Sequence, residues 1–328
     1  MQLLRIDHET KLVYSEPVHE SVVEVRMAPP STEDQTVLGY RLRTTPPVPI
    51  TTYRDGFGNR TELFTLSTPH EDMVIRTACC VRVHRRSGEE RLAEIPWPAE
   101  ATTSIDAIEF LRPSPLVEMS GDVQAFCAST REPKGTFLEA VETMMKSVRA
   151  ALKYEKKVTA ADTPVSEALK IGSGVCQDFA HLLLALARHW NLPARYVSGY
   201  INQPGELATH AWAQLWAGPM VGWVDIDPTM GKWVGIEHVV TAVGRDFSEV
   251  PPNRGVWKGN ATETISVSVN VQPVDRVPLD LSDSGDGAAW TSSSYSPPSE
   301  RSGGPPKDRL IQQRQRQAFR QQQSQQQQ

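Results

Sequence analysis

The chain has 328 residues, 39% hydrophobic and 22% charged, so it can bury a sizeable core and form more than one domain. Its formal net charge of -5 offers no basic footprint, which argues against a nucleic-acid partner. Charged residues interrupt the apolar ones over residues 1–15, so we expect no signal peptide, no membrane association and a cytoplasmic location.

The 4 cysteines are too few and too irregularly spaced for a disulfide framework or a paired-cysteine zinc site. Cys79 and Cys80 lie in a β-branched run, which predicts two buried and inert thiols. We therefore expect reduced cysteines, no metal and no cofactor.

Residues 1–100 alternate between short strand-like runs and clusters of Pro, Gly and Asp, which is typical of a β-rich module. Gly and Asn between Asp55 and Asn59 suit a tight turn, because both residue types tolerate a positive φ. We expect a small β-sandwich, with strands near residues 10–14, 21–27, 37–42 and 73–83.

Residues 101–274 change from helical to strand-like periodicity, which predicts an α+β core. Apolar spacing predicts helices over residues 136–148, 163–169 and 175–190. Strand-like runs follow at residues 194–200, 211–217, 223–227 and 264–271.

Residues 275–328 form a tail rich in Ser, Gly and Pro that ends in a Gln-rich stretch. Such a composition cannot bury enough apolar surface to offset the entropy of ordering, so we predict a disordered tail. Its arginines make the end basic and allow contact with an unknown acidic partner, although a solvated tail without a fixed role is the simpler interpretation.

Cys176 has the most reactive position, where Gly172-Ser173-Gly174-Val175 gives way to an apolar helical pattern. A thiol on the first turn of a helix faces unpaired backbone N–H groups and the positive end of the helix dipole, which favour the thiolate. An isolated cysteine at a helix start is more often a small buried residue, so the role of Cys176 depends on its partners.

A thiolate that attacks an amide needs an imidazole to move the proton and an acceptor to orient the imidazole. His210 begins one strand-like run, and Asp225 and Asp227 lie at the end of the next. The two aspartates share a face, since side chains two apart point the same way. Two antiparallel strands would bring His210 beside this pair. His181 lies off the helical face of Cys176 and is expected to be a buried structural histidine.

These residues lie in three segments that resemble the transglutaminase-like superfamily. The segments are Gly174-Val175-Cys176-Gln177-Asp178, His210-Ala211-Trp212, and Gly222-Trp223-Val224-Asp225-Ile226-Asp227-Pro228-Thr229. Residues 1–100 resemble the β module that precedes such cores in a bacterial branch. The resemblance implies a papain-like core with a triad of Cys176, His210 and Asp227. Asp225 then becomes an exposed or supporting carboxylate. Asp178 follows Cys176 by two positions and can hydrogen-bond N–H groups of the helix start, which favours a structural role.

The chain departs from the animal members of the family, because no tryptophan precedes the cysteine in the core to support an oxyanion. The backbone N–H of Cys176 is the first candidate donor, and Gln177 or Tyr200 a second. Trp212 is a candidate for excluding water near the histidine, with core packing as the simpler alternative. No acidic loop suggests activation by calcium.

The resemblance implies a thiol enzyme that acts on peptide or carboxamide bonds through a cysteine thioester, with a protein or peptide as substrate. We favour hydrolysis over transfer to an amine, a choice that depends on which acceptor reaches the thioester. The alternative is a catalytically inactive scaffold of the same fold that serves as an interaction protein.

Overall fold

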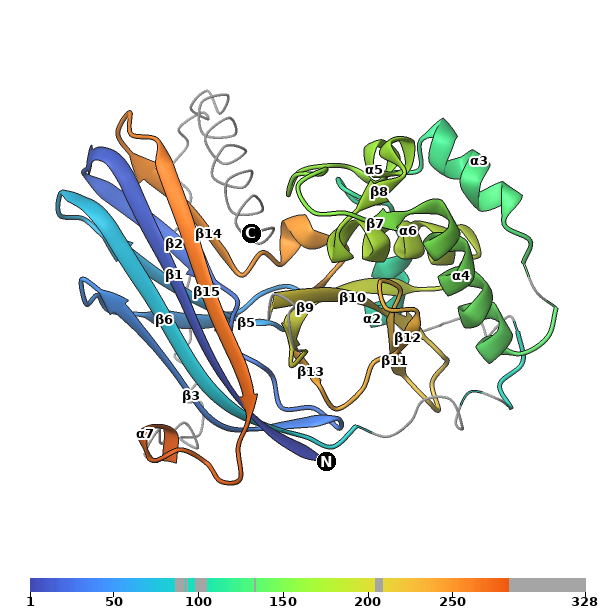
Figure 1. Cartoon of the computed structure of the whole chain (residues 1–328), viewed down its shortest axis with the longest axis horizontal. Coiled ribbons are helices and arrows are strands. Elements are labelled where there is room, and N and C mark those ends of the chain that lie inside the picture. Colours follow the sequence, from blue (N-terminus) through green and yellow to red (C-terminus); the bar gives the residue numbers. More distant parts are fainter. Residues whose placement is uncertain (86–91, 93, 98–104, 133, 204–208, 283–328) are drawn as a thin grey trace, which may run out of the picture.

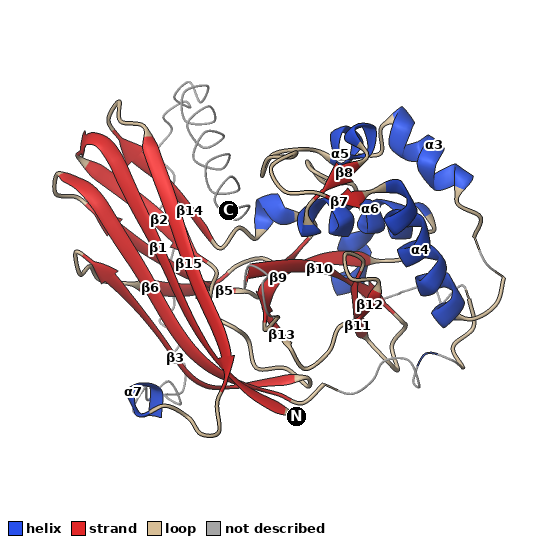
Figure 2. Cartoon of the chain, in the orientation of Figure 1, coloured by secondary structure: helices blue, strands red, loops and turns tan. Residues whose placement is uncertain are grey.

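The computed structural model describes residues 1–85, 92, 94–97, 105–132, 134–203 and 209–282 (Figure 1). Two layered β-sheets form one region, and a third sheet covered by helices forms the other (Figure 2). The predicted disorder of the tail beyond Ser282 falls outside the described residues. None of the helices in the described part of the chain is long and apolar enough to cross a membrane.

The first region is a sandwich of two four-stranded antiparallel sheets. One has the order β15-β1-β6-β3, formed by Glu263–Pro273, Gln2–Val18, His70–Val83 and Gln35–Thr45. The other has the order β14-β2-β5-β4, formed by Asn253–Lys258, Glu20–Val25, Arg60–Leu66 and Thr51–Arg54.

Alternating apolar residues hold the sandwich together, because successive side chains of a strand point to opposite faces. Leu12 and Ile75 of the first sheet pack in one cluster with Val23 and Phe64 of the second. All four side chains are at most 2% exposed. The β-sandwich expected over the first 100 residues is therefore present, and Cys79 and Cys80 are buried in β6 as predicted.

The sandwich also contains two strands from the end of the described chain. β15 pairs with β1 over the register from Leu4 opposite Pro273 to Tyr14 opposite Glu263, and β14 pairs with β2. Residues 253–273 are expected in the α+β core from their place in the sequence, but they lie in the β region instead. Local periodicity identifies such strands but not their distant partners, since a period of two is common to both sheets.

The second region is an α+β unit around a five-stranded antiparallel sheet of order β12-β11-β10-β9-β13. Its strands are Lys232–Trp233, Trp223–Asp227, Thr209–Trp216, Ala194–Ile201 and His238–Gly244. The helices are α2 Ile105–Ile108, α3 Gly121–Ser129, α4 Phe137–Ala151, α5 Val165–Ile171 and α6 Cys176–His189, with 3-10 turns at Glu109–Leu111 and Phe247–Glu249. A short parallel pair joins β7 Lys153–Tyr154 to β8 Ser173–Gly174.

Helix α6 lies at the centre of this unit and packs against β10 and β9. Its leucines, including Leu182, Leu183 and Leu186, share a core with the β10 residues Ala211 and Leu215. A helix buried around most of its circumference explains the near-continuous apolar run in the sequence. The predicted helix over residues 175–190 and the strands predicted at residues 194–200, 211–217 and 223–227 are confirmed as parts of an α+β core.

Two side-chain amides join the regions by completing the edge strand β13. Gln35 donates to the carbonyl of Val240 and accepts from its N–H, both at 2.9 Å. Asn59 forms the same pair with Val243, at 2.8 Å for each bond. An edge strand exposes unpaired backbone groups, so these amides take the place of a neighbouring strand.

The beginning of the predicted tail is ordered. Helix α7, Leu279–Ser282, packs on β3, and Leu281 is fully buried. A Cβ at Gly39 would lie 2.6 Å from the Leu281 carbonyl oxygen, so only glycine fits there. Residues 275–282 therefore belong with the β-sandwich rather than with a tail.

Candidate active site

The first turn of α6 presents Cys176 at its start. Val175 precedes the helix in an extended conformation, and its N–H donates to the Asp178 carboxylate at 2.8 Å. Asp178 therefore caps the helix start, as expected from the sequence. A Cβ at Gly174 would lie 2.4 Å from this carboxylate, so glycine leaves the space that the cap occupies. Burial raises the pKa of Asp178 to about 6, against opposing hydrogen bonds from Thr159 and Val175.

Cys176 differs from the other cysteines in its accessibility. It is partly exposed, whereas Cys79, Cys80 and Cys127 are buried, and all four thiols are free. Burial raises the pKa of Cys79 and of Cys127, the latter to about 11. The partly exposed Cys176 is therefore the thiol that a substrate can reach.

His210 and Asp227 come from the neighbouring strands β10 and β11, which pair antiparallel. The Nε2–H of His210 donates to Asp227 Oδ2 at 2.7 Å, with the carboxylate fully buried and the histidine 8% exposed. The other carboxylate oxygen accepts the N–H groups of Thr229 and Met230, at 3.0 and 3.1 Å. The turn after β11 thus holds the Asp227 carboxylate in place, and this carboxylate orients the imidazole of His210.

Opposite charges strengthen the bond between His210 and Asp227. Burial by itself would lower the pKa of His210, but hydrogen bonds to Asp227 and Cys176 reverse this effect and raise the pKa to about 10. The Asp227 pKa lies well below its ordinary value, because hydrogen bonds from two histidines outweigh the cost of burial. Since Nε2 is bound to Asp227, Nδ1 is the ring nitrogen left for Cys176. The arrangement favours an imidazolium next to the thiol.

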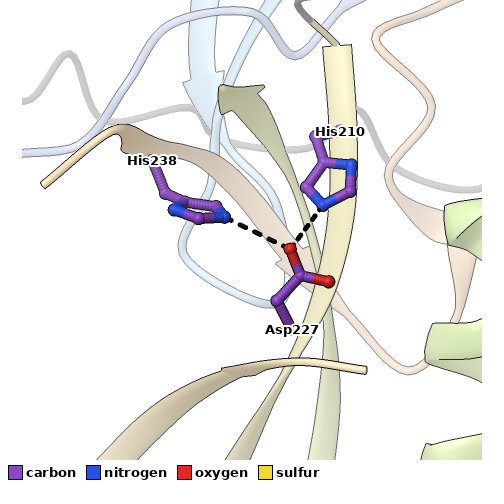
Figure 3. A group of neighbouring side chains, drawn as sticks. All are labelled: His210, Asp227 and His238. Atoms are coloured by element: carbon purple, nitrogen blue, oxygen red, sulfur yellow. Dashed lines mark hydrogen bonds and ion pairs between the residues drawn. The ribbon is translucent and has the colours of Figure 1, made fainter. Parts of the chain in front are cut away.

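A second histidine shares the buried carboxylate, as Figure 3 shows. His238 begins β13 and donates from Nε2 to Asp227 Oδ2 at 3.3 Å, while its Nδ1 accepts the N–H of Gly235 at 3.3 Å. These two bonds define a neutral ring, and burial correspondingly lowers the pKa of His238. One aspartate thus holds one charged and one neutral imidazole.

The same three residues carry ligand atoms within 4.8 Å of one another, a spacing that a metal ion could use. Their hydrogen bonds already satisfy the groups, with His210 and His238 both donating to Asp227 Oδ2. The donor set therefore needs no metal to explain its geometry.

Trp212 packs behind this group and lies away from solvent. Its ring is fully buried and stacks near His210, with ring centroids 6.1 Å apart. Its Nε1–H donates to Asp225 Oδ1 at 2.7 Å, so Asp225 is the supporting carboxylate. A Cβ at Gly199 would lie 2.3 Å from the Trp212 ring, so glycine makes room for the indole. Trp212 thus holds the histidine in place and offers no face to a substrate.

The two expected second oxyanion donors are engaged elsewhere. Gln177 donates from its side chain to the carbonyl of Ala161 at 3.1 Å and is 3% exposed. The Tyr200 hydroxyl lies 2.8 Å from His8 Nδ1 in β1, and the ring packs among residues of the sandwich. Tyr200 therefore serves the contact between the two regions.

Sequence reasoning missed His238 and Gly199, and it identified His181 only as a structural residue. His181 is fully buried, and its Nε2 accepts the N–H of Phe247 at 3.2 Å, in agreement with that expectation. His238 stands in Ile236-Glu237-His238, with no motif around it. The sequence indicated only a histidine at the start of a strand-like run. Its contact with Asp227 depends on how the strands are arranged in the sheet.

A partly exposed cysteine at a helix start, facing a histidine held by a buried aspartate, defines a thiol-type site on an α+β core. Residues 4–82 match the model of the bacterial transglutaminase-like N-terminal region, and residues 124–228 match that of the transglutaminase-like superfamily. The chain belongs to the transglutaminase-like superfamily.

Relatives support this membership over most of the chain. An uncharacterized protein of Mycobacterium leprae is 31% identical, with 83% of this chain and 99% of that protein covered. One of Mycobacterium tuberculosis is 32% identical, with 83% and 93% covered. A solved structure from Cytophaga hutchinsonii, described as a candidate cysteine protease, has a TM-score of 0.68 at 22% identity and covers 84% of this chain and 93% of that one. The last likeness is one of fold.

Proposed function

We propose that the chain is a cysteine hydrolase that cleaves peptide or carboxamide bonds through a thioester on Cys176. The observation that carries this proposal is the position of His210, which bonds Asp227 at 2.7 Å through Nε2 and interacts with Cys176 through its other side. This is the order of groups that nucleophilic acyl transfer requires.

The reaction begins when the Cys176 thiolate adds to the carbonyl carbon. The backbone N–H of Cys176, which as the first of the helix has no intrahelical acceptor, is the proposed donor to the resulting oxyanion. His210 then gives its Nδ1 proton to the departing amine or ammonia as the C–N bond breaks. Water, deprotonated by the now neutral His210, attacks the thioester and releases the acid and the thiolate.

Hydrolysis is proposed over amine transfer, because water reaches a partly exposed thiol without a dedicated acceptor site. The name given to the Cytophaga hutchinsonii structure fits the same reaction class. A cytoplasmic location is proposed as well, since all four cysteines are free.

The test is turnover of a glutamine-containing peptide library by the full chain, with released ammonia, cleaved peptides and incorporated amine measured in parallel. Cys176→Ala should abolish all products. Cys127→Ala, the same change at a buried thiol of α3, is the matched control and should keep the wild-type rate. Equal turnover by wild type and Cys176→Ala would refute the proposal, and no turnover by the wild type would favour the inactive scaffold.

A further inference from the structure

A cavity separate from the candidate active site lies between the sandwich and the core sheet. Its volume is about 510 Å³. The wall-forming residues that matter here are Phe57, Arg85, Arg195, Gln214, Trp223 and Asp225. No member of the triad lines it, so the cavity needs a separate explanation.

Three neighbouring strands supply the polar floor of this cavity. Gln214 on β10 lies opposite Arg195 on β9 and opposite Asp225 on β11. Residues directly opposite each other across antiparallel strands share a face, so the three side chains form one row. Arg195 donates from Nε to Gln214 Oε1 at 2.6 Å, and its guanidinium lies over Trp223 at 4.2 Å from the ring centre.

Arg85 reaches the cavity from the end of the sandwich and is only 6% exposed. Its Nη1 lies 3.2 Å from Asp225 Oδ2. Nevertheless, its Nε and Nη1 are buried and donate no aligned hydrogen bond to any residue within the described ranges. These two atoms have almost no accessible surface, so an acceptor in the cavity would pair with the positive charge of the guanidinium rather than with these two N–H groups.

The floor carries more positive than negative charge. Arg85 pairs with one oxygen of Asp225 and Trp212 donates to the other, while the charge of Asp225 acts on Arg195 at longer range. Burial lowers the pKa of Arg195 to about 10, and the charge of Asp225 only partly offsets this effect. Glu33 and Asp34 also line the cavity, but Glu33 is exposed and Asp34 half-buried, so solvent screens them more.

We propose that this cavity binds the carboxylate of a small ligand with an apolar body. A planar carboxylate can accept two parallel N–H bonds from a guanidinium. Trp223 and Phe57 line the same cavity with aromatic surface, which suits an apolar group attached to that carboxylate.

The test uses the full chain carrying Cys176→Ala, so that its result does not depend on catalysis. N-acetylphenylalanine and its C-terminal amide are titrated by calorimetry and by tryptophan fluorescence. The acid should bind and the amide should bind at least about tenfold more weakly, because the amide lacks the charge. Arg85→Gln and Arg195→Gln should each weaken binding of the acid about tenfold or more, while Arg254→Gln, at the exposed edge of the sandwich, should leave it unchanged.

Absence of binding by the acid, or equal binding of acid and amide, would overturn the proposal. So would undiminished binding in the arginine variants. Circular dichroism checks that each variant is folded. If Arg85→Gln is unfolded, Arg195→Gln and the comparison of acid with amide still decide the result.

Discussion

Asp227→Asn should convert His210 from a cation to a neutral ring at neutral pH. The pKa of His210 is about 10, against an ordinary value of 6.5. A difference of about 3.5 pKa units corresponds to roughly 5 kcal/mol that favours the imidazolium. Asparagine keeps an oxygen for the Thr229 and Met230 N–H groups, so the turn survives while the charge is lost.

The direction of this change in the His210 pKa follows from two opposing effects. Burial disfavours the cation, and Asp227 together with Cys176 favours it. Without the Asp227 charge, burial weighs more, so the pKa should fall by at least about 3 units, from about 10 to below 7, and turnover at pH 7.5 by at least about 100-fold.

The assay is an NMR titration of the histidine side chains, with the His210 signal assigned by its absence in His210→Gln. Asp225→Asn is the matched control, since Asp225 is a buried carboxylate two residues away on the same strand. It should leave the His210 pKa nearly unchanged. An unaltered His210 titration in Asp227→Asn would show that Asp227 does not control this imidazole.

Three further changes test the surroundings of the site by urea unfolding. His238→Leu removes a donor to buried Asp227 and should lower the free energy of unfolding by about 2 kcal/mol; no change would contradict the bond. Asp178→Asn should leave the free energy of unfolding unchanged at pH 3 and raise it by up to about 3 kcal/mol at pH 8. The reason is that the pKa of Asp178 is raised from 3.8 to about 6, so the charged carboxylate destabilises the folded state as the pH rises through this range. An effect of Asp178→Asn that does not change with pH would contradict this prediction. Gly199→Ala should cost at least about 2 kcal/mol by crowding the Trp212 ring, whereas Gly56→Ala, with nothing within 4 Å, should cost little.

Much of the fold could be predicted because its signals are local. The periodicity of α6 and the alternation of β1 and β6 each reflect one buried face, which the neighbouring residues determine. The pairing of β14 and β15 with β2 and β1 could not be predicted in this way. It joins residues more than 200 positions apart, and many strands have the same alternation.

In the candidate site, too, some residues could be predicted from local sequence and others depend on distant parts of the chain. Cys176, His210 and Asp227 stand in recognisable segments, and the structure brings His210 and Asp227 into contact. His238 begins β13, which β9 and β10 separate from β11 in the sheet, so no pattern around His238 indicates its contact with Asp227. Tyr200 had a suitable sequence position, but the side of β9 that it occupies faces His8 in the sandwich.

Peptide mapping after brief labelling with limiting iodoacetamide at pH 7.5 tests whether His210 activates the thiol of Cys176. Cys176 should be labelled, while burial should protect Cys79, Cys80 and Cys127. His210→Asn should slow labelling of Cys176 by at least about tenfold, because the imidazolium that favours the thiolate is lost. An unlabelled Cys176, or an equal rate in His210→Asn, would contradict a thiolate activated by His210.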